Sequence, residues 1–277
     1  MSPLAVPLAT APLAAPLSVP SGLASGGTSA SDVWEQVTSV QPAVPYLLVV
    51  LTAAAALAVV VAPRLWHLFR NAITIAHEGG HALVAVACGR RLRSIRLHSD
   101  TSGLTVTRGR PSGFGMVLTL MAGYLFPSLI GIGGAALLAA HHVTLGLWIY
   151  IVLLFLMLVM IRNLYGVITV IVTGGVAFIV SWYASTQVQA VFAYFAVWLL
   201  LIGGVRPLFE LAGQRRRREV SGSDVDQLAG LTHVAGIIWL AAFTIVTCVL
   251  LVFGVSLLGL LHVPPDGLFG GARAFFS

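Results

Sequence analysis

The stretch AHEGGHALVA, residues 76–85, places two histidines and a glutamate inside an apolar run of the chain. On a helix, residues four apart lie on one face, so His77 and His81 can turn two imidazole nitrogens toward one metal ion. Glu78 falls beside them, where its carboxylate can take a proton from a zinc-bound water. Because ionisable side chains are costly inside a membrane, three of them close together indicate a functional metal site.

The chain around this stretch has the composition of a membrane protein. Of its 277 residues, 58% are hydrophobic and 9% are charged, with a mean hydropathy of +0.97, whereas soluble domains carry about 25% charged residues. All 15 basic residues are arginines, which form short clusters between apolar runs. Such clusters orient a chain in the lipid bilayer. We therefore expect a multi-pass protein of the cell membrane that has no nucleic-acid partner.

Seven apolar runs predict the membrane-spanning helices. They cover residues 46–62, 71–88, 114–140, 144–161, 164–182, 188–204 and 231–262. Because a spanning helix needs roughly 20 residues, the fold class predicted is an all-α polytopic membrane protein with about six to seven transmembrane helices. Residues 45–263 form the expected membrane domain. Residues 1–44, rich in proline and alanine, predict a disordered tail, and residues 264–277 a short C-terminal tail.

A β-hairpin is predicted between the second and third apolar runs. In RLRSIRLHSDTSGLTVTRG, residues 91–109, Ile95 and Leu97 alternate with polar residues, as do Leu104 and Val106. The segment SDTSG separates the two arms and supplies the residues of a turn.

The arginine clusters predict an orientation. They flank the hairpin and follow the fourth and sixth apolar runs. If they all face the cytoplasm, seven spans alternate, and the two termini lie on opposite sides of the membrane. Arg64, Arg70 and Arg273 then lie on the outer side of the membrane. Glu210 and Glu219 bracket the arginine run 215–218 and are expected to pair with it.

The motif HEGGHALVA in a membrane helix, a short basic hairpin and then GYLFP, residues 123–127, resemble the site-2 protease family of intramembrane zinc metalloproteases. The resemblance covers roughly residues 70–239 and is closest to the compact bacterial branch without a PDZ domain. It implies Zn²⁺-dependent cleavage of transmembrane segments of membrane-protein substrates. On the matching positions, His77 and His81 are the implied zinc ligands and Glu78 the general base. The hairpin would present the substrate in extended form.

A catalytic zinc requires a third protein ligand. The family takes it from an N-x-x-P-x-x-x-x-D-G pattern, in which Asn163 matches the asparagine but Ile171 stands at the position of the aspartate. The resemblance implies that Asn163 helps to hold the substrate or the oxyanion. Asp224, Asp226 and Asp100 remain candidates for the third ligand. Asp224 is preferred because its segment resembles an SDA segment of the compact branch, although SDVD is also good helix-capping chemistry.

Two functions follow from this sequence. The first is a zinc-dependent intramembrane endopeptidase. The alternative is a non-catalytic membrane scaffold, or pseudoprotease, that keeps a structural metal site. A scaffold should tolerate Glu78→Gln, whereas a protease should lose its activity while still binding zinc. The sequence leaves the oligomeric state and the identity of the substrate open.

Overall fold

The computed structural model describes residues 29–218 and 222–261, together with residues 265, 267, 271 and 275. The expectations for residues 1–28, for Glu219 and Arg273, and for most of the C-terminal tail lie outside this part of the chain. Residues 1–37 form a unit separate from residues 38–277. Most of helix α1 (Ala30–Thr38) belongs to the first unit, within the segment predicted to be a disordered tail.

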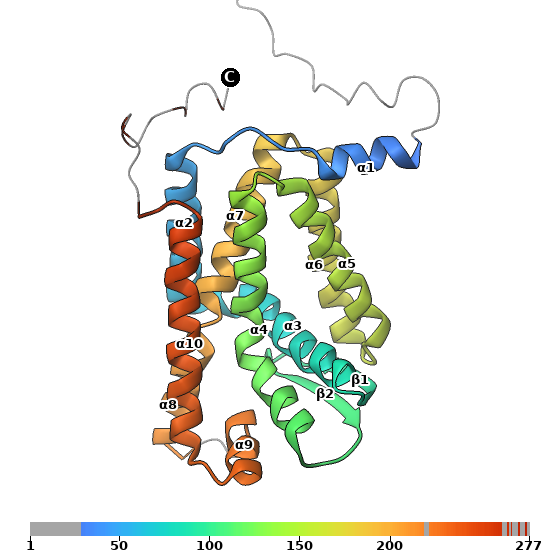
Figure 1. Cartoon of the computed structure of the whole chain (residues 1–277), viewed down its shortest axis with the longest axis vertical. Coiled ribbons are helices and arrows are strands. Elements are labelled where there is room, and N and C mark those ends of the chain that lie inside the picture. The colour runs from blue at the N-terminus through green and yellow to red at the C-terminus, as the bar shows by residue number, and fades with distance from the viewer. Residues whose placement is uncertain are drawn as a thin grey trace, which may run out of the picture. The chain divides into compact units, whose positions relative to one another are not determined.

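The second unit is a bundle of helices with a small β-sheet near one end (Figure 1). Seven helices follow the seven apolar runs: α2 (Tyr46–Val61), α3 (Pro63–Ala87), α4 (Phe114–Ala139), α5 (Val143–Met160), α6 (Leu164–Tyr183), α7 (Thr186–Gly203) and α10 (Gly236–Leu257). Among the described residues, α4, α5, α6, α10 and the pair of α7 with α8 (Arg206–Arg216) are long and apolar enough to span a membrane. The predicted fold class is confirmed.

Helices α2 and α3 are sharply bent against each other, by 104°. Pro63 begins α3, and Ala62 before it is extended, with φ −75° and ψ 118°, because proline disfavours the helical conformation in the preceding residue. The pair makes one broken span at most, so the described residues contain five or six helices, or bent pairs of helices, that are long and apolar enough to span a membrane. The seven-span alternation is therefore wrong. Helix α2 begins and α10 ends at the same end of the bundle (Figure 1), where the Tyr46 hydroxyl donates to the Leu260 carbonyl at 3.2 Å.

The predicted hairpin is present as β1 (Arg91–Leu97) and β2 (Gly103–Arg108). The strands pair antiparallel, with Ile95 opposite Thr105. Ile95 and Leu97 are each only 1% exposed, whereas Leu104 and Val106 remain exposed. One arm of the alternating pattern therefore anchors the hairpin in the protein, and the apolar residues of the other arm face outward.

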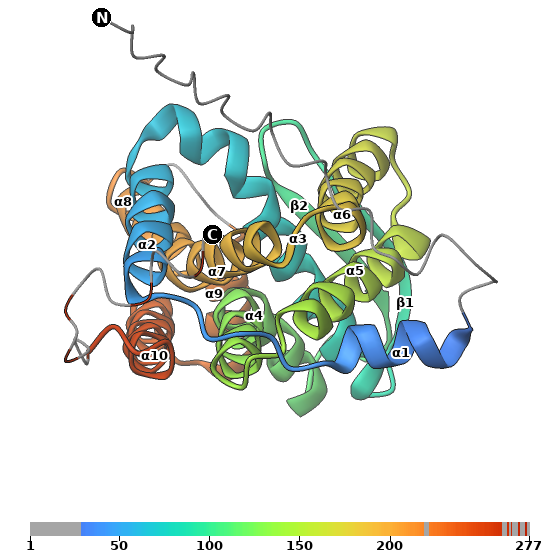
Figure 2. The same ribbon diagram turned by 90° about the horizontal axis from the view of Figure 1, so that it is seen from above.

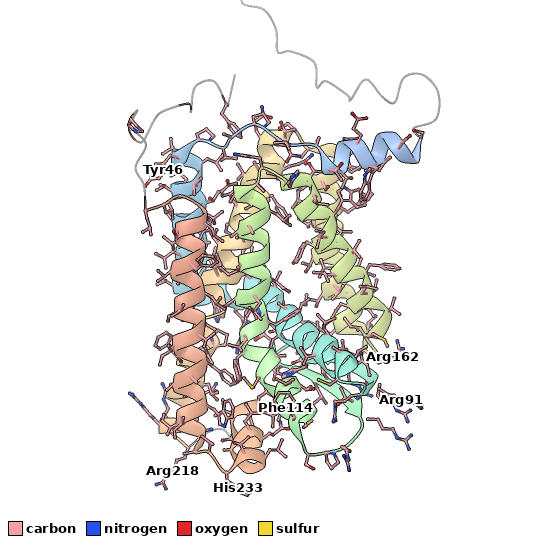
Figure 3. The ribbon with its side chains drawn as sticks, viewed as in Figure 1. Tyr46, Arg91, Phe114, Arg162, Arg218 and His233 are labelled. Atoms are coloured by element: carbon pink, nitrogen blue, oxygen red, sulfur yellow. The ribbon has the colours of Figure 1, made fainter. Side chains whose placement is uncertain are left out.

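Arginines gather at the end of the bundle that carries the hairpin. Figure 3 shows Arg91, Arg162 and Arg218 at this end and Tyr46 at the opposite end. The short helix α9 (Asp224–Thr232) lies at the same end as these arginines (Figure 1). The chain therefore has one strongly basic end.

Glu210 pairs with arginines other than those predicted. Arg206 Nε donates to Glu210 Oε1 at 2.9 Å, and Arg70 Nη1 lies 3.2 Å from Glu210 Oε2. The expected pairing of Glu210 with the run 215–218 is wrong, because α8 turns this side chain toward α3. Arg70, expected on the outer side of the membrane, pairs with this residue of α8.

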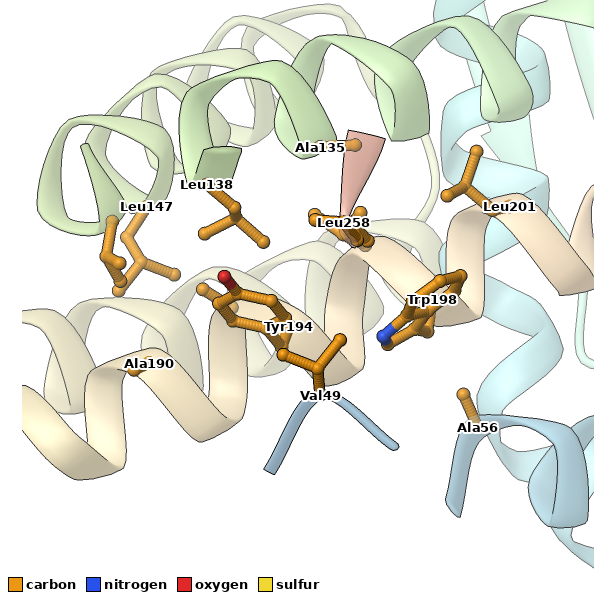
Figure 4. Packing of buried hydrophobic residues seen from close by; sticks show 13 residues of the cluster. Val49, Ala56, Ala135, Leu138, Leu147, Ala190, Tyr194, Trp198, Leu201 and Leu258 are labelled. Atoms are coloured by element: carbon orange, nitrogen blue, oxygen red, sulfur yellow. The ribbon is translucent and has the colours of Figure 1, made fainter. Parts of the chain in front are cut away.

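Helix α7 forms the centre of the largest apolar cluster. Trp198 and Tyr194 are buried in this cluster together with Val49 of α2 and Leu138 of α4 (Figure 4). Seen from above, α7 lies beside both α2 and α4 (Figure 2). This packing holds α4 in place, and α4 in turn supports the helix that carries the histidines.

Helices α3 and α4 approach each other closely at Gly80. A Cβ atom at this position would lie 2.8 Å from Phe126 Cγ and 3.0 Å from the Ala122 carbonyl oxygen. The neighbouring Gly79 faces away from α4, and a Cβ there would meet only Met157 Sδ, at 4.0 Å. The two glycines of HEGGH therefore have different surroundings.

We expect Gly80→Ala to lower the free energy of unfolding by about 1–3 kcal/mol, because the added methyl group overpacks the contact between α3 and α4. Gly79→Ala is the matched control and should be neutral or slightly stabilising, because alanine has the higher helix propensity. Thermal unfolding of the two variants in detergent, followed by circular dichroism, measures the difference. Equal stability would contradict the close approach at Gly80.

Candidate metal centre

His77 and His81 lie one turn apart on α3 and turn their imidazoles to the same point. Their Nε2 atoms are 3.1 Å apart, and the rings meet edge to face, with centroids 4.7 Å apart. Glu78, between them in sequence, is only 4% exposed. The i, i+4 spacing thus sets two ring nitrogens side by side, as the sequence predicted.

A backbone carbonyl of α4 fixes the orientation of His81. The Nδ1 atom of His81 lies 2.7 Å from the Thr119 carbonyl oxygen. Because a carbonyl oxygen only accepts hydrogen bonds, Nδ1 donates and carries the proton. In the neutral imidazole, Nε2 is then left with a free lone pair, the form in which histidine binds metals.

Gly123 of α4 makes room for both imidazoles. A Cβ atom at this position would lie 2.7 Å from His77 Cε1 and closer still to the His81 ring. Tyr124 follows it, and its ring stands edge-on to His77, with centroids 4.9 Å apart. The GYLFP segment therefore forms the wall behind the histidines.

Asp224 reaches the histidines from the first turn of α9. Its Oδ2 atom lies 3.1 Å from His77 Nε2 and 3.2 Å from His81 Nε2. Burial raises the pKa of the Asp224 carboxyl, but the adjacent imidazoles of His77 and His81 outweigh this effect and hold the pKa well below its usual range. Asp224 is thus an anionic partner for the two imidazoles.

The other two candidate aspartates have different partners. Asp226 accepts hydrogen bonds from Ser223 N at 3.1 Å and Ser223 Oγ at 2.8 Å, which completes a capping box at the start of α9. It also forms an ion pair with Arg215. Asp100 lies in the hairpin turn and accepts from Ser102 Oγ at 2.7 Å. The capping chemistry of SDVD is therefore provided by Ser223 and Asp226, which leaves Asp224 directed at the histidines.

The three converging atoms fit a zinc ion. Their mutual separations of 3.1–3.2 Å are close to the roughly 3.4 Å between neighbouring ligands of a tetrahedral zinc with bonds of about 2.1 Å. Two imidazole nitrogens and one carboxylate oxygen are a donor set typical of catalytic zinc. In the part of the chain that the structure describes, His77, His81 and Asp224 are the group of side chains placed to hold a metal ion.

The hairpin covers Glu78. Thr105 Oγ1 donates to Glu78 Oε2 at 2.6 Å, and a Cβ atom at Gly103 would lie 2.6 Å from Glu78 Cδ. Both residues belong to β2, so this strand runs directly past the carboxylate. Gly103 is required there because any side chain would displace Glu78.

Two cavities border Glu78 and His77. One, of about 320 Å³, lies between β2, α4 and the start of α9. The other, of about 200 Å³, opens toward Arg70 and α8. Both are also lined by Gly103 and Tyr124, so they border the same point from two sides. A third, apolar cavity of about 440 Å³ lies on the opposite face of α3 and is lined by none of these side chains.

Asn163 contacts the backbone of β1. Its Oδ1 atom accepts from Leu97 N at 3.1 Å and its Nδ2 donates to Leu97 O at 2.5 Å. Nearby, Arg162 N donates to Ile95 O at 3.0 Å. Asn163 and Arg162 therefore already use the backbone groups of Leu97 and Ile95 on the outer edge of β1. The larger polar cavity is bordered by the other strand, β2. These contacts do not test the direct role in substrate or oxyanion binding predicted for Asn163.

Several residues of the site were not found from the sequence. The carbonyl of Thr119 belongs to the backbone and has no sequence signal. Thr105 alternates with Leu104 and Val106 in the hairpin, so its position on the other face was predictable, although its contact with Glu78 was not. Arg215 is one of four consecutive arginines, and the sequence does not distinguish it from its neighbours.

Comparison with known proteins identifies the family. A family model described as Peptidase M50B-like matches residues 50–254, which include α3, the hairpin and α9. No curated protein and no solved structure matches the chain. Since the match covers most of the chain and agrees with the predicted resemblance to site-2 proteases, this protein belongs to the Peptidase M50B-like family of membrane metalloproteases.

Proposed function

We propose that this chain is an active, zinc-dependent intramembrane endopeptidase that cleaves transmembrane segments of other membrane proteins. One observation carries the proposal. His77 Nε2, His81 Nε2 and Asp224 Oδ2 converge within 3.2 Å of one another, beside the buried carboxylate of Glu78. Ionisable side chains are costly inside an apolar bundle, and where they occur they usually have a function.

His77, His81 and Asp224 would hold the zinc ion. When bound, zinc supplies Lewis-acid chemistry, which lowers the pKa of a water molecule and polarises a carbonyl group. The hydrogen bond from His81 Nδ1 to Thr119 keeps the ring in the required tautomer.

Glu78 would move the proton. Its carboxylate accepts a proton from the attacking water as the water oxygen bonds to the scissile carbonyl carbon. As the C–N bond breaks, Glu78 returns this proton to the leaving amine, so that hydrolysis consumes one water molecule. The hydrogen bond from Thr105 Oγ1 holds one oxygen of Glu78 in place and leaves the other available.

The substrate would bind as an extended strand along β2. A peptide bond within a helix is already hydrogen-bonded, so the substrate segment must unwind locally before cleavage. An exposed strand edge can pair with the unwound backbone. The two polar cavities follow the hairpin on either side of Gly103 and pass Glu78 and His77. Asn163 would support this arrangement by holding β1, and thereby the sheet, against α6.

The basic end of the bundle supports an orientation with the site near the cytoplasmic face of the cell membrane. The hairpin arginines and the run 215–218 lie in segments adjacent to the site, and arginine-rich loops favour the cytoplasmic side. The lipid bilayer and a membrane-protein substrate are the partners that this function requires.

Zinc content tests the metal site. We expect about one zinc ion per chain in detergent-purified wild-type protein, loss of zinc in His77→Ala, and reduced zinc in Asp224→Ala, because each change removes one ligand. Elemental analysis of folded, size-fractionated protein measures the ratio.

Asp100→Ala is the matched control for Asp224→Ala, because it makes the same change at another candidate aspartate, which lies in the hairpin turn. This variant should keep its zinc. A wild-type protein that holds no zinc, or a His77→Ala variant that holds as much as wild type, would contradict the proposed site.

Glu78→Gln tests catalysis. The change should lower proteolysis by about 10²–10⁴-fold, because it removes the group that transfers the proton, while the zinc content stays at the wild-type value. The measurement compares membrane proteins from cells that produce wild-type or Glu78→Gln protein, by mass spectrometry of new chain ends inside transmembrane segments.

Glu35→Gln, an equivalent change at an exposed residue of the N-terminal unit, serves as the control and should leave cleavage unchanged. Chain ends that are equally abundant with Glu78→Gln would favour the non-catalytic scaffold.

A further inference from the structure

Helix α8 contacts both elements that carry the proposed metal ligands. His77 and His81 belong to α3, and Asp224 belongs to α9. One charged side chain near the middle of α8 pairs with α3, and another in its last turn pairs with α9. The sequence offered only a topological role for this segment.

The first contact joins α8 to α3 through Glu210. Its Oε1 accepts from Trp66 Nε1 at 2.9 Å and from Arg206 Nε at 2.9 Å. Its Oε2 lies 3.2 Å from Arg70 Nη1. Arg70 precedes His77 by two turns on the same face of α3. The Glu210 carboxylate thus contacts α3, the helix that carries the histidines, through Trp66 and Arg70. It contacts the first turn of α8 through Arg206.

The second contact joins α8 to α9 through Arg215. Its guanidinium forms an ion pair with Asp226 Oδ1, while Asp226 Oδ2 accepts from Gly222 N and Ser223 N, both at 3.1 Å. Arg215 also packs closely beneath Gly236, where a Cβ atom would lie 2.7 Å from its Nη2. Asp226 is therefore bound on both oxygens, and it lies two residues from Asp224.

Apolar contacts accompany these ion pairs. Leu208 and Leu211 of α8 share a buried cluster with Val225 and Leu228 of α9. The apolar side chains bring the two helices together without fixing the rotation of α9, because apolar contacts have no preferred direction. The ion pair and the capping box add directional contacts at the end of α9 that carries Asp224.

We propose that α8 is a brace between the two ligand-bearing helices and that Arg215 is a positioning residue for the third metal ligand. The inference rests on the proposed zinc site. Helix α9 has nine residues and is too short to be stable without external contacts. Arg215 holds Asp226, Asp226 holds the first turn of α9, and this turn directs the Asp224 carboxylate at the two imidazoles.

Arg215→Gln tests the brace through zinc affinity. We expect the dissociation constant for Zn²⁺, measured by competition with a chromophoric chelator in detergent, to rise about 10–100-fold, the range found when a group that orients a metal ligand is removed. Arg216→Gln is the matched control. It removes the same charge from the next position of the same helix, where the side chain is exposed, and should leave the affinity unchanged.

A spectroscopic readout separates positioning from general stability. In Co²⁺-substituted protein, the visible absorption reports the number and geometry of the ligands. The Arg215→Gln spectrum should shift toward that of Asp224→Ala, and Arg215→Lys, which keeps the charge, should recover part of the wild-type spectrum. If Arg215→Gln does not yield folded protein, Asp226→Asn removes the other partner and takes its place.

Equal zinc affinity of Arg215→Gln and Arg216→Gln, with unchanged cobalt spectra, would overturn the brace and leave the proposed protease intact. A parallel loss of affinity in both variants would also overturn it, because the effect would then follow net charge. A wild-type protein that binds no zinc would overturn both the brace and the proposed function.

Discussion

The arrangement of this protein depends on the cost of placing ionisable side chains among apolar helices. A charge at the centre of a membrane helix costs about 2.5–3.5 kcal/mol even on insertion scales, and α3 carries two histidines and a glutamate at adjoining positions. His77, His81 and Asp224 turn their acceptor atoms to one point. Lone pairs at such distances repel one another unless a proton or a cation lies among them, so a divalent cation would satisfy all three at once.

The polar face of α3 accounts for the structure around it. The hairpin covers Glu78, α4 supplies the carbonyl for His81, and α9 supplies the carboxylate. These partners can approach only because Gly80 and Gly123 have no side chains at the point where α3 crosses α4. The bend at Pro63 has the same effect on a larger scale, since it takes α3 out of line with α2 and lets other elements surround it. Helix α3 is thus a central helix and not an independent span.

The sequence predicted the features that depend on local spacing. The i, i+4 spacing of HEGGH, the alternation in the arms of the hairpin and the length of the apolar runs can each be read within one short segment of the sequence. Asp224 was preferred over Asp226 and Asp100 by resemblance, because nothing local separates the two aspartates of SDVD. The span count was too high in the alternating scheme, because length and apolarity do not show that two consecutive runs are bent into one. The contacts of Glu210 with Trp66 and Arg70, and those of Asn163 with Leu97, were also not predictable, because these partners lie far away in the chain. The pair of Glu210 with Arg206 has the local i, i+4 spacing.

The position of α6 explains why a carboxylate at residue 171 would not reach the histidines. The family pattern would place it at residue 171, but Ile171 is 53% exposed on a helix that packs mainly against α5. A carboxylate there would face lipid and not the histidines. Helix α9 instead lies at the basic end of the bundle (Figure 1), and its first turn places Asp224 Oδ2 within 3.2 Å of both imidazoles. The position of a ligand on such a short helix depends on the contacts that hold this helix in place. In the proposed site, the position of the third ligand would therefore depend on the charged contacts between α8 and α9 as well as on the motif of α3.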